Sequence, residues 1–224
     1  MVRPYMKTCA IVVAAGTSQR MGFDKLMAPL AGKAVLQHSL EALSQCEDID
    51  GIVVVAGEER RVFIEGLGLT NVVAIVEGGA ERHHSVANGL AAVPQETEFV
   101  AVHDAARPLI QAEQISACLA AAREHGAASL AHRITETVKR ADESGFVTES
   151  LDRNNLWAME TPQCFRLDLL REAYSVVLKD GLFITDEVSA MQHFGKGVRV
   201  IENYHQNPKI TFKADISFAE KLKL

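Results

Sequence analysis

The sequence predicts an α/β fold in which a mostly parallel central sheet is covered by helices on both faces. Apolar runs alternate along the chain with segments whose apolar residues stand three and four positions apart. The runs are typical of strands buried in a parallel sheet, and the spacing is typical of amphipathic helices. Their regular alternation indicates a parallel sheet. The expected strands are 9–14, 51–56, 71–76 and 98–103, and the expected helices are 35–43, 58–68, 82–93 and 111–126.

The alternation stops between about 127 and 165, where short β-prone pieces surround a turn at 142–145. A hairpin that projects from the sheet fits this stretch better than another crossover, and we place a β-arm at about residues 133–160. The remaining expected elements are helices at 167–179 and 185–194, a strand at 198–202 and a helix near 214–223. The 224 residues contain no repeat or linker, so we expect a single domain, 1–224, that carries this arm.

Composition argues against several classes of protein. The chain is 48% hydrophobic and 23% charged, as in an average globular protein. A net charge of −6 argues against binding to nucleic acid or to a membrane surface, so an anionic ligand must be held by a few placed cations. No apolar segment has the length of a membrane span or the features of a signal peptide. The four cysteines lack metal-binding spacing, and we expect a cytoplasmic protein.

The segment "AAGTSQRMGFDK" at 14–25 follows the first expected strand and joins small residues to two cations. Gly16 and its small neighbours allow backbone N–H groups to approach a phosphate closely. Arg20 offers a planar fork and Lys25 a compact charge, which together suit crowded phosphate oxygens. The segment matches neither the dinucleotide-binding fingerprint nor the P-loop, which argues against a Rossmann oxidoreductase. An exposed turn with two solvated cations is the alternative.

The segment "VHDAARP" at 102–108 is the second candidate for chemistry. Asp104 follows an expected strand, and a carboxylate there suits Mg²⁺, whose coordination shell substrate phosphates usually complete. Arg107 is close enough in sequence to bind the same anionic substrate. Asp104 could equally cap the next helix. His103 is expected to be a packed or hydrogen-bonded histidine, because no second metal ligand stands at a suitable spacing.

These segments resemble the 2-C-methyl-D-erythritol 4-phosphate cytidylyltransferases of the non-mevalonate isoprenoid pathway, and the resemblance covers almost the whole chain. The matching segments, in the order of the family, are "AAGTSQRMG", "GGAERHHSVANGL", "VHDAARP", "TVKRA", "LDRNNLWAMETPQCF", "ITDEVSAM" and "NPKITF". The resemblance implies a Rossmann-like nucleotidyltransferase. It implies that a phosphate oxygen of 2-C-methyl-D-erythritol 4-phosphate attacks the α-phosphorus of CTP, that CMP is transferred and that pyrophosphate leaves.

The resemblance also implies the roles of individual residues. Arg20 and Lys25 would be catalytic cations at the α-phosphate, and Asp104 would be a catalytic residue that binds Mg²⁺ or Mn²⁺. The implied nucleotide-binding residues are Ala14, Ala15, Gly16, Gly79, Ser85 and Asp104. The implied residues for the polyol phosphate are Arg107, Thr137, Arg153, Thr185 and Lys209. Thr137 and Arg153 lie in the expected arm, which in this family swaps into the partner subunit of a homodimer.

The chain departs from the usual family pattern at three positions: Ser18 stands where glycine is usual, Asp24 where proline is usual, and Ala80 where an acidic residue is frequent. The pattern "SxRMGxDK" is similar to that of the guanylyltransferases of molybdenum-cofactor assembly, which lack the arm motif. Two further alternatives are a ribitol 5-phosphate cytidylyltransferase and a non-catalytic nucleotide-binding sensor. A sensor would be expected to lose the catalytic cations or the metal carboxylate, which this chain keeps.

Other polar and aromatic residues are expected to have structural roles. Trp157 is expected to pack the arm, and His83 and His84 are expected to be solvated at a helix start. Asp186 and Glu187 are expected in the first turn of a helix, where the macrodipole favours acidic residues.

Overall fold

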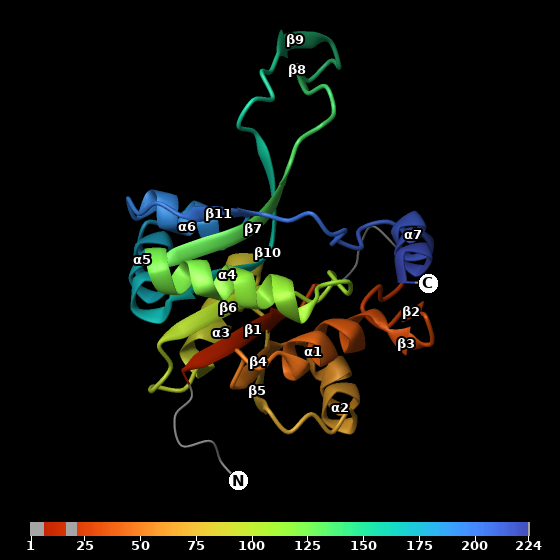
Figure 1. The fold of residues 1–224 in the computed structure, drawn as a ribbon, viewed down its shortest axis with the longest axis vertical. Coiled ribbons are helices and arrows are strands. Elements are labelled where there is room, and N and C mark those ends of the chain that lie inside the picture. Colours follow the sequence, from red (N-terminus) through yellow and green to blue (C-terminus); the bar gives the residue numbers. More distant parts are fainter. Residues whose placement is uncertain (1–6, 17–21, 224) are drawn as a thin grey trace.

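The computed structural model describes residues 7–16 and 22–223, and its centre is a seven-stranded sheet (Figure 1). The strand order is β11-β7-β10-β6-β1-β4-β5, and β10 alone runs antiparallel to its neighbours. The strands are β1 (Thr8–Val13), β4 (Gly51–Val55), β5 (Val72–Val76), β6 (Phe99–Asp104), β7 (Ala127–Arg133), β10 (Trp157–Arg166) and β11 (Arg199–Glu202). This architecture confirms the predicted α/β class with a mostly parallel sheet.

Helices cover both faces of this sheet, as the apolar spacing predicts. They are α1 (Val35–Gln45), α2 (Glu58–Gly66), α3 (Arg82–Ala92), α4 (Ala112–His125), α5 (Leu167–Lys179), α6 (Glu187–His193) and α7 (Lys213–Lys223). In Figure 1, α1 and α4 lie on the face toward the viewer. Within the described ranges, no helix combines the length and the apolar character that crossing a lipid bilayer requires.

The side chains of β1 show why the molecule has two apolar layers. Successive side chains of a strand point to opposite faces. Ala10 and Val12 accordingly pack in the core beneath α1 and α4, whereas Cys9 and Ile11 pack in the core beneath α3 and α5. All four are fully buried, which explains why this central strand is apolar on both faces from Cys9 to Val13.

The hairpin of β8 (Lys139–Ala141) and β9 (Val147–Ser150) projects from the body of the molecule (Figure 1). Its turn is built by Asp142, whose carboxylate accepts the N–H groups of Ser144 and Phe146, each at 3.0 Å. Every residue from 139 to 150 is exposed. The flanking strands β7 and β10 belong to the central sheet, so the projecting part is shorter than the expected arm of 133–160. The remaining strands, β2 (Pro29–Leu30) and β3 (Lys33–Ala34), form a separate pair.

The packing of α3 on the sheet can be tested at Gly89. A methyl group at this position would lie 2.7 Å from Ile11 Cγ2 and 3.0 Å from Val55 Cγ2. We therefore expect Gly89→Ala to lower the free energy of unfolding by about 1–3 kcal/mol, although alanine favours the helix itself by about 1 kcal/mol. Urea unfolding measures this change.

The matched control is Gly66→Ala at the end of α2, where an added methyl group meets no atom within 4 Å. This change should be neutral or raise the free energy of unfolding by about 0.4–1 kcal/mol. A Gly89→Ala protein as stable as the Gly66→Ala protein would contradict the close contact between α3 and the sheet.

Candidate active site

The site lies where the direction of the chain's crossovers reverses. From β1 the chain moves outward through β4 to β5, and α3 then returns it to β6 on the other side of β1. Ligands of open α/β sheets bind at the carboxyl ends of the strands beside such a reversal. Here Val13 pairs in register with Asp104, and the Ala105 N–H donates to the Val13 carbonyl at 3.1 Å. The segment that begins at Ala14 and the carboxylate of Asp104 are therefore neighbours.

Asp104 is held between cations on both sides of its carboxylate. Arg82 donates to Oδ1 through Nη2 at 3.0 Å and Nε at 3.2 Å, and Lys209 Nζ lies 2.7 Å from Oδ2. Burial alone would raise the pKa of Asp104, but Arg82 and then Lys209 and Arg107 hold it well below its usual range. Asp104 is therefore ionised at neutral pH. Its side chain binds these cations and does not serve as the helix cap considered as an alternative.

Arg82 is fixed in turn by a buried carboxylate from α6. Glu187 is fully buried, and its oxygens accept Nη1 of Arg82 at 2.7 Å and Nη2 at 3.1 Å. The Tyr174 hydroxyl also donates to Glu187 at 2.8 Å. Burial alone would lower the pKa of Arg82, but Glu187 and Asp104 raise it well above its ordinary value. One guanidinium thus joins two acids that are distant in sequence.

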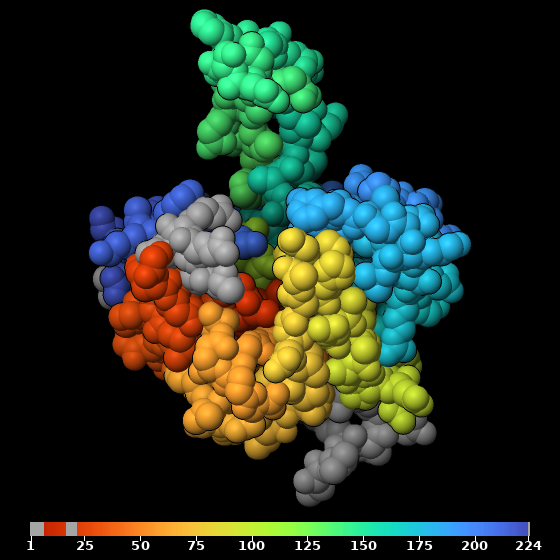
Figure 2. Space-filling model, turned by 180° about the vertical axis from the view of Figure 1, so that it is seen from behind, coloured from red at the N-terminus to blue at the C-terminus, as the bar shows by residue number. Residues whose placement is uncertain are grey.

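A pocket of about 450 Å³ opens beside these charges. It is lined by Arg82, Asp104, Arg107, Met159, Glu160, Thr161, Gln163, Thr185, Asp186, Val188, Ser189, Gln192 and Lys209. Four residues expected at the site are in this lining: Asp104, Arg107, Thr185 and Lys209. In Figure 2 the surface is hollowed below the arm, beside the yellow residues at the start of α3. Thr137 and Arg153 do not line this pocket. They are exposed in the arm, where Arg153 donates to the Thr135 carbonyl.

Arg107 joins two segments of backbone at the floor of the pocket. Its Nη1 donates to the Asn207 carbonyl at 2.7 Å, and its Nη2 donates to the Met159 carbonyl at 3.2 Å. Burial lowers its pKa, and the carboxylates of Asp104 and Glu160 oppose that shift. The buried Nε of Arg107 has no hydrogen-bond partner in the structure. Arg107 therefore fixes the segment that carries Lys209 and keeps one N–H group unused.

Small residues allow the segment after β1 and the segment before α3 to approach each other closely. The Gly79 N–H donates to Ser85 Oγ at 3.0 Å, and Ser85 Oγ donates to the Glu81 carbonyl at 3.2 Å. A Cβ added to Gly78 would collide with the methyl group of Ala15. The backbone after β1 and the backbone before α3 are therefore in direct contact, and the implied nucleotide-binding residues Ala14, Ala15, Gly16, Gly79 and Ser85 lie in or beside these two segments.

Of the two cations expected in the segment after β1, Arg20 and Lys25, only Lys25 is among the described residues. Lys25 is half-buried, and its Nζ donates to the Ile210 carbonyl at 2.8 Å. Arg20 and Ser18 lie outside the described residues. Asp24, which replaces the usual proline of the family, forms an ion pair with the buried Arg60 at 2.8 Å.

Sequence reasoning assigned no role at the site to Arg82, Glu187 or Arg60. A physical signal was available for the two arginines, since both lie in the first turn of a helix. The macrodipole disfavours a cation there, which indicates that the arginine is held by other partners. Glu187 gave no such signal, because an acid in a first turn is ordinary. Only the fold shows that it is buried.

The histidine predictions had different outcomes. His103 is fully buried, burial lowers its pKa to about 4, and its ring contacts the Thr161 hydroxyl and the Arg107 carbonyl, which confirms a packed histidine. The prediction of a solvated His83 is wrong. Its ring is buried edge-on against Phe183, with centroids 5.9 Å apart, because the segment before α6 covers the start of α3.

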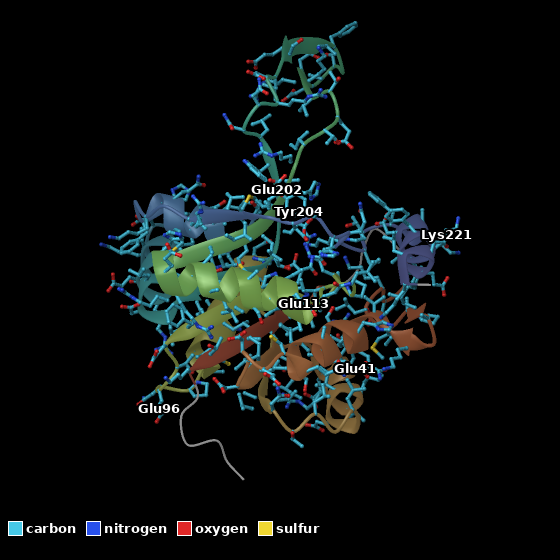
Figure 3. All side chains as sticks on the ribbon, viewed as in Figure 1. Glu41, Glu96, Glu113, Glu202, Tyr204 and Lys221 are labelled. Carbon is cyan, nitrogen blue, oxygen red and sulfur yellow. The ribbon has the colours of Figure 1, made fainter. Side chains whose placement is uncertain are left out.

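Trp157 packs at the base of the arm, as predicted. The Arg133 guanidinium lies 4.3 Å from the centre of its ring, and Arg133 also pairs with Glu202 at 3.2 Å. Figure 3 shows Glu202 and Tyr204 at this base.

The donor set around Asp104 suits a metal that is bound together with substrate. The described residues contain no group of three or more His, Cys, Asp or Glu side chains that could hold a metal ion. Asp104 is ionised, which is the form that binds a cation, and it lines an open pocket. Proteins commonly bind Mg²⁺ through one or two carboxylates, with substrate phosphates and water completing the shell. Asp104 would supply one carboxylate ligand to Mg²⁺ in exchange for a contact with Arg82 or Lys209, and substrate phosphates and water would supply the other ligands.

Comparisons with known proteins agree with this geometry. The family of 2-C-methyl-D-erythritol 4-phosphate cytidylyltransferase matches residues 8–223. The enzyme of that name from Pelotomaculum thermopropionicum is 39% identical over 221 residues, which cover 96% of this chain and 93% of the relative. The solved structure of 4-diphosphocytidyl-2C-methyl-D-erythritol synthase from Anaerococcus prevotii has a TM-score of 0.85 and 28% identity, covering 96% of this chain and 95% of that chain. The Francisella tularensis cytidylyltransferase structure has a TM-score of 0.83 and 31% identity, covering 96% and 99%. The chain therefore belongs to the 2-C-methyl-D-erythritol 4-phosphate cytidylyltransferase family.

Proposed function

We propose that the pocket at the carboxyl ends of β1 and β6 transfers a cytidylyl group from CTP to 2-C-methyl-D-erythritol 4-phosphate. A phosphate oxygen of the polyol attacks the α-phosphorus, the bond from that phosphorus to the bridging oxygen breaks, and pyrophosphate leaves. The product is 4-diphosphocytidyl-2-C-methyl-D-erythritol, an intermediate of non-mevalonate isoprenoid synthesis. One observation carries the proposal: in a chain of this family, an ionised Asp104 lines a pocket together with Arg82, Arg107 and Lys209.

The reaction needs charge stabilisation more than covalent help. We assign Arg20 and Lys25 to the crowded α-phosphate, because both stand in the segment that leaves β1 beside Gly16. Backbone groups of Ala14, Ala15 and Gly16, together with Gly79 and Ser85, would hold the cytidine. Asp104 would hold Mg²⁺ or Mn²⁺ together with phosphate oxygens of CTP. When bound, the cation neutralises charge on those phosphates.

The polyol phosphate would occupy the other half of the pocket. Thr185, Arg107 and Lys209 line it and present a hydroxyl and two cations. We propose that Thr137 and Arg153 complete this half from the arm of a second subunit in a homodimer. The exposed apolar side chains at the tip of the arm, Phe146 and Val147, support a role in packing on another surface.

The reaction would take place in the cytoplasm, because the four cysteines are buried free thiols. Two alternatives make different demands on the site. A ribitol 5-phosphate enzyme would share the half of the pocket that binds cytidine and would differ in the half that binds the polyol phosphate. A non-catalytic sensor would not need Lys25 and Asp104 together.

The first test measures pyrophosphate release with purified protein. Activity should require Mg²⁺ or Mn²⁺ and be lost in EDTA. It should also be about 100-fold higher with CTP than with ATP, GTP or UTP, because a wrong base leaves buried polar groups unpaired. The matched polyol control is ribitol 5-phosphate, which should turn over much more slowly than 2-C-methyl-D-erythritol 4-phosphate. Equal turnover with GTP, or a preference for ribitol 5-phosphate, would contradict the proposal.

The second test asks whether the arm serves the partner's pocket. Lys25→Ala and Arg153→Ala proteins should each be nearly inactive alone. In a two-fold dimer with exchanged arms, a mixed dimer has one doubly damaged site and one intact site. Random exchange makes half of the dimers mixed, so activity should recover to roughly a quarter of the wild-type value.

Coexpression with two tags provides the control for this test. Purified mixed dimers should reach about half of the wild-type activity per site. If Arg153 acted within its own subunit, every site would lack one residue and mixing would restore nothing. Mixed dimers that carry both tags and remain inactive would therefore refute the donation of the arm to the partner.

A further inference from the structure

One buried arginine outside the pocket lining holds the backbone on both sides of residues 17–21. Arg60 lies in the first turn of α2 and is only 3% exposed. Its Nη1 donates to the Ala14 carbonyl at 2.6 Å, and its Nη2 donates to the Gly16 carbonyl at 3.2 Å. Its Nε donates to Asp24 Oδ2 at 2.8 Å. One planar side chain thus contacts three groups that belong to two flanking segments.

Burial makes this arrangement specific to arginine. A buried cation is costly unless carboxylates and acceptors pair it. Asp24 supplies the principal charge, and Glu59 adds a more exposed carboxylate 3.3 Å from Nη1. Lysine could not reach three acceptors in one plane. The buried guanidinium therefore needs the acceptors of Ala14, Gly16 and Asp24 to offset its burial, and these three groups are held in place by it.

The two carbonyl contacts also orient backbone donors. In a trans peptide, the C=O of one residue and the N–H of the next point in opposite directions. Because Arg60 binds the Ala14 carbonyl, the N–H of Ala15 points away from α2. Ala14 has already made its last strand bond, from its N–H to the Val55 carbonyl at 2.7 Å. Beyond that bond, Arg60 restrains the backbone through the carbonyls of Ala14 and Gly16.

The Asp24 contact orients the other flank. Its Oδ1 accepts the Leu26 N–H at 3.0 Å while its Oδ2 accepts from Arg60. Lys25 stands between Asp24 and Leu26, so a rotation of this turn would move its side chain. The position of Lys25 therefore depends on the pair of Arg60 and Asp24.

We propose that Arg60 is a positioning residue for cytidylyl transfer, which holds the nucleotide-binding backbone at Ala14–Gly16 and the turn that carries Lys25 in their working geometry. This inference rests on the proposed function of the pocket. Arg60 acts through those groups and does not touch substrate. A misplacement of about 1 Å at such groups costs on the order of 100-fold in rate.

The experiment compares Arg60→Gln with Arg61→Gln. Arg61 is the next residue of α2; it pairs with Glu58 at 2.8 Å and donates to the Ile75 carbonyl at 3.1 Å, and neither contact involves Ala14, Gly16 or Asp24, so it is the matched control. We expect Arg60→Gln to lower kcat about 100-fold and to weaken CTP binding, measured by calorimetry, about tenfold, with little change in KM for the polyol phosphate. Arg61→Gln should keep both values within about twofold of wild type, since surface ion pairs contribute little.

Asp24→Asn provides a variant that does not leave a hole in the core, because Asp24 is partly exposed. It should lower kcat about tenfold. The double variant should be no worse than Arg60→Gln alone, because Arg60→Gln has already removed the ion pair that Asp24→Asn breaks. Circular dichroism reports whether each variant is folded.

Folded Arg60→Gln and Asp24→Asn proteins with the kcat and CTP affinity of Arg61→Gln would overturn the inference. If Arg60→Gln does not fold, Asp24→Asn alone decides: wild-type kcat overturns the inference and a tenfold loss supports it. Failure of the proposed function is separate, because it appears as a wild-type protein without turnover. In that case the CTP affinities measured by calorimetry decide: a tenfold weaker affinity of Arg60→Gln than of Arg61→Gln supports the inference, and equal affinities overturn it.

Discussion

The carboxylate of Asp104 is the group on which the rest of the site depends. It ends β6 at the reversal point of the sheet and binds Arg82 from α3 and Lys209 from the segment before α7. Arg82 in turn binds Glu187 at the start of α6. Buried charges are strongly destabilising when one partner is lost, so each of these residues depends on the others. Charge pairing around one carboxylate thus brings four distant segments of the chain to one pocket.

The segment 207–210 connects the two halves of this pocket. The Asn207 carbonyl accepts from Arg107, Lys209 binds Asp104, and the Ile210 carbonyl accepts from Lys25. The half proposed for the polyol phosphate and the loop proposed for the α-phosphate are therefore tied to the same few residues. Arg60 binds the described residues on both flanks of residues 17–21, through the Ala14 carbonyl and the Asp24 carboxylate. A movement of segment 207–210 would therefore displace its contacts with Arg107, Asp104 and Lys25 together.

Much of the fold was predictable because strands such as β1 consist mainly of consecutive apolar residues and helices such as α5 have regularly spaced apolar residues. Asp104 was predictable because a carboxylate directly follows the end of the strand expected at 98–103. The pairing of Arg82 with Glu187 was not, since 105 positions separate them and only the topology brings them together. The sheet strands at the base of the arm were missed because their apolar runs are short. Thr137 and Arg153 do not line the pocket of their own chain, and their role at the site stays a prediction.

The most direct test of the proposed role of Asp104 is the affinity for CTP, measured by calorimetry with and without Mg²⁺ and without the polyol phosphate. In the wild-type protein, Mg²⁺ should strengthen CTP binding at least tenfold, which is about 1.4 kcal/mol. In folded Asp104→Asn protein this gain should disappear. Metal-free CTP should still bind this variant measurably, so that the absence of a gain from Mg²⁺ can be distinguished from the loss of the whole site. An Asp104→Asn protein that keeps the full gain from Mg²⁺ would contradict the account.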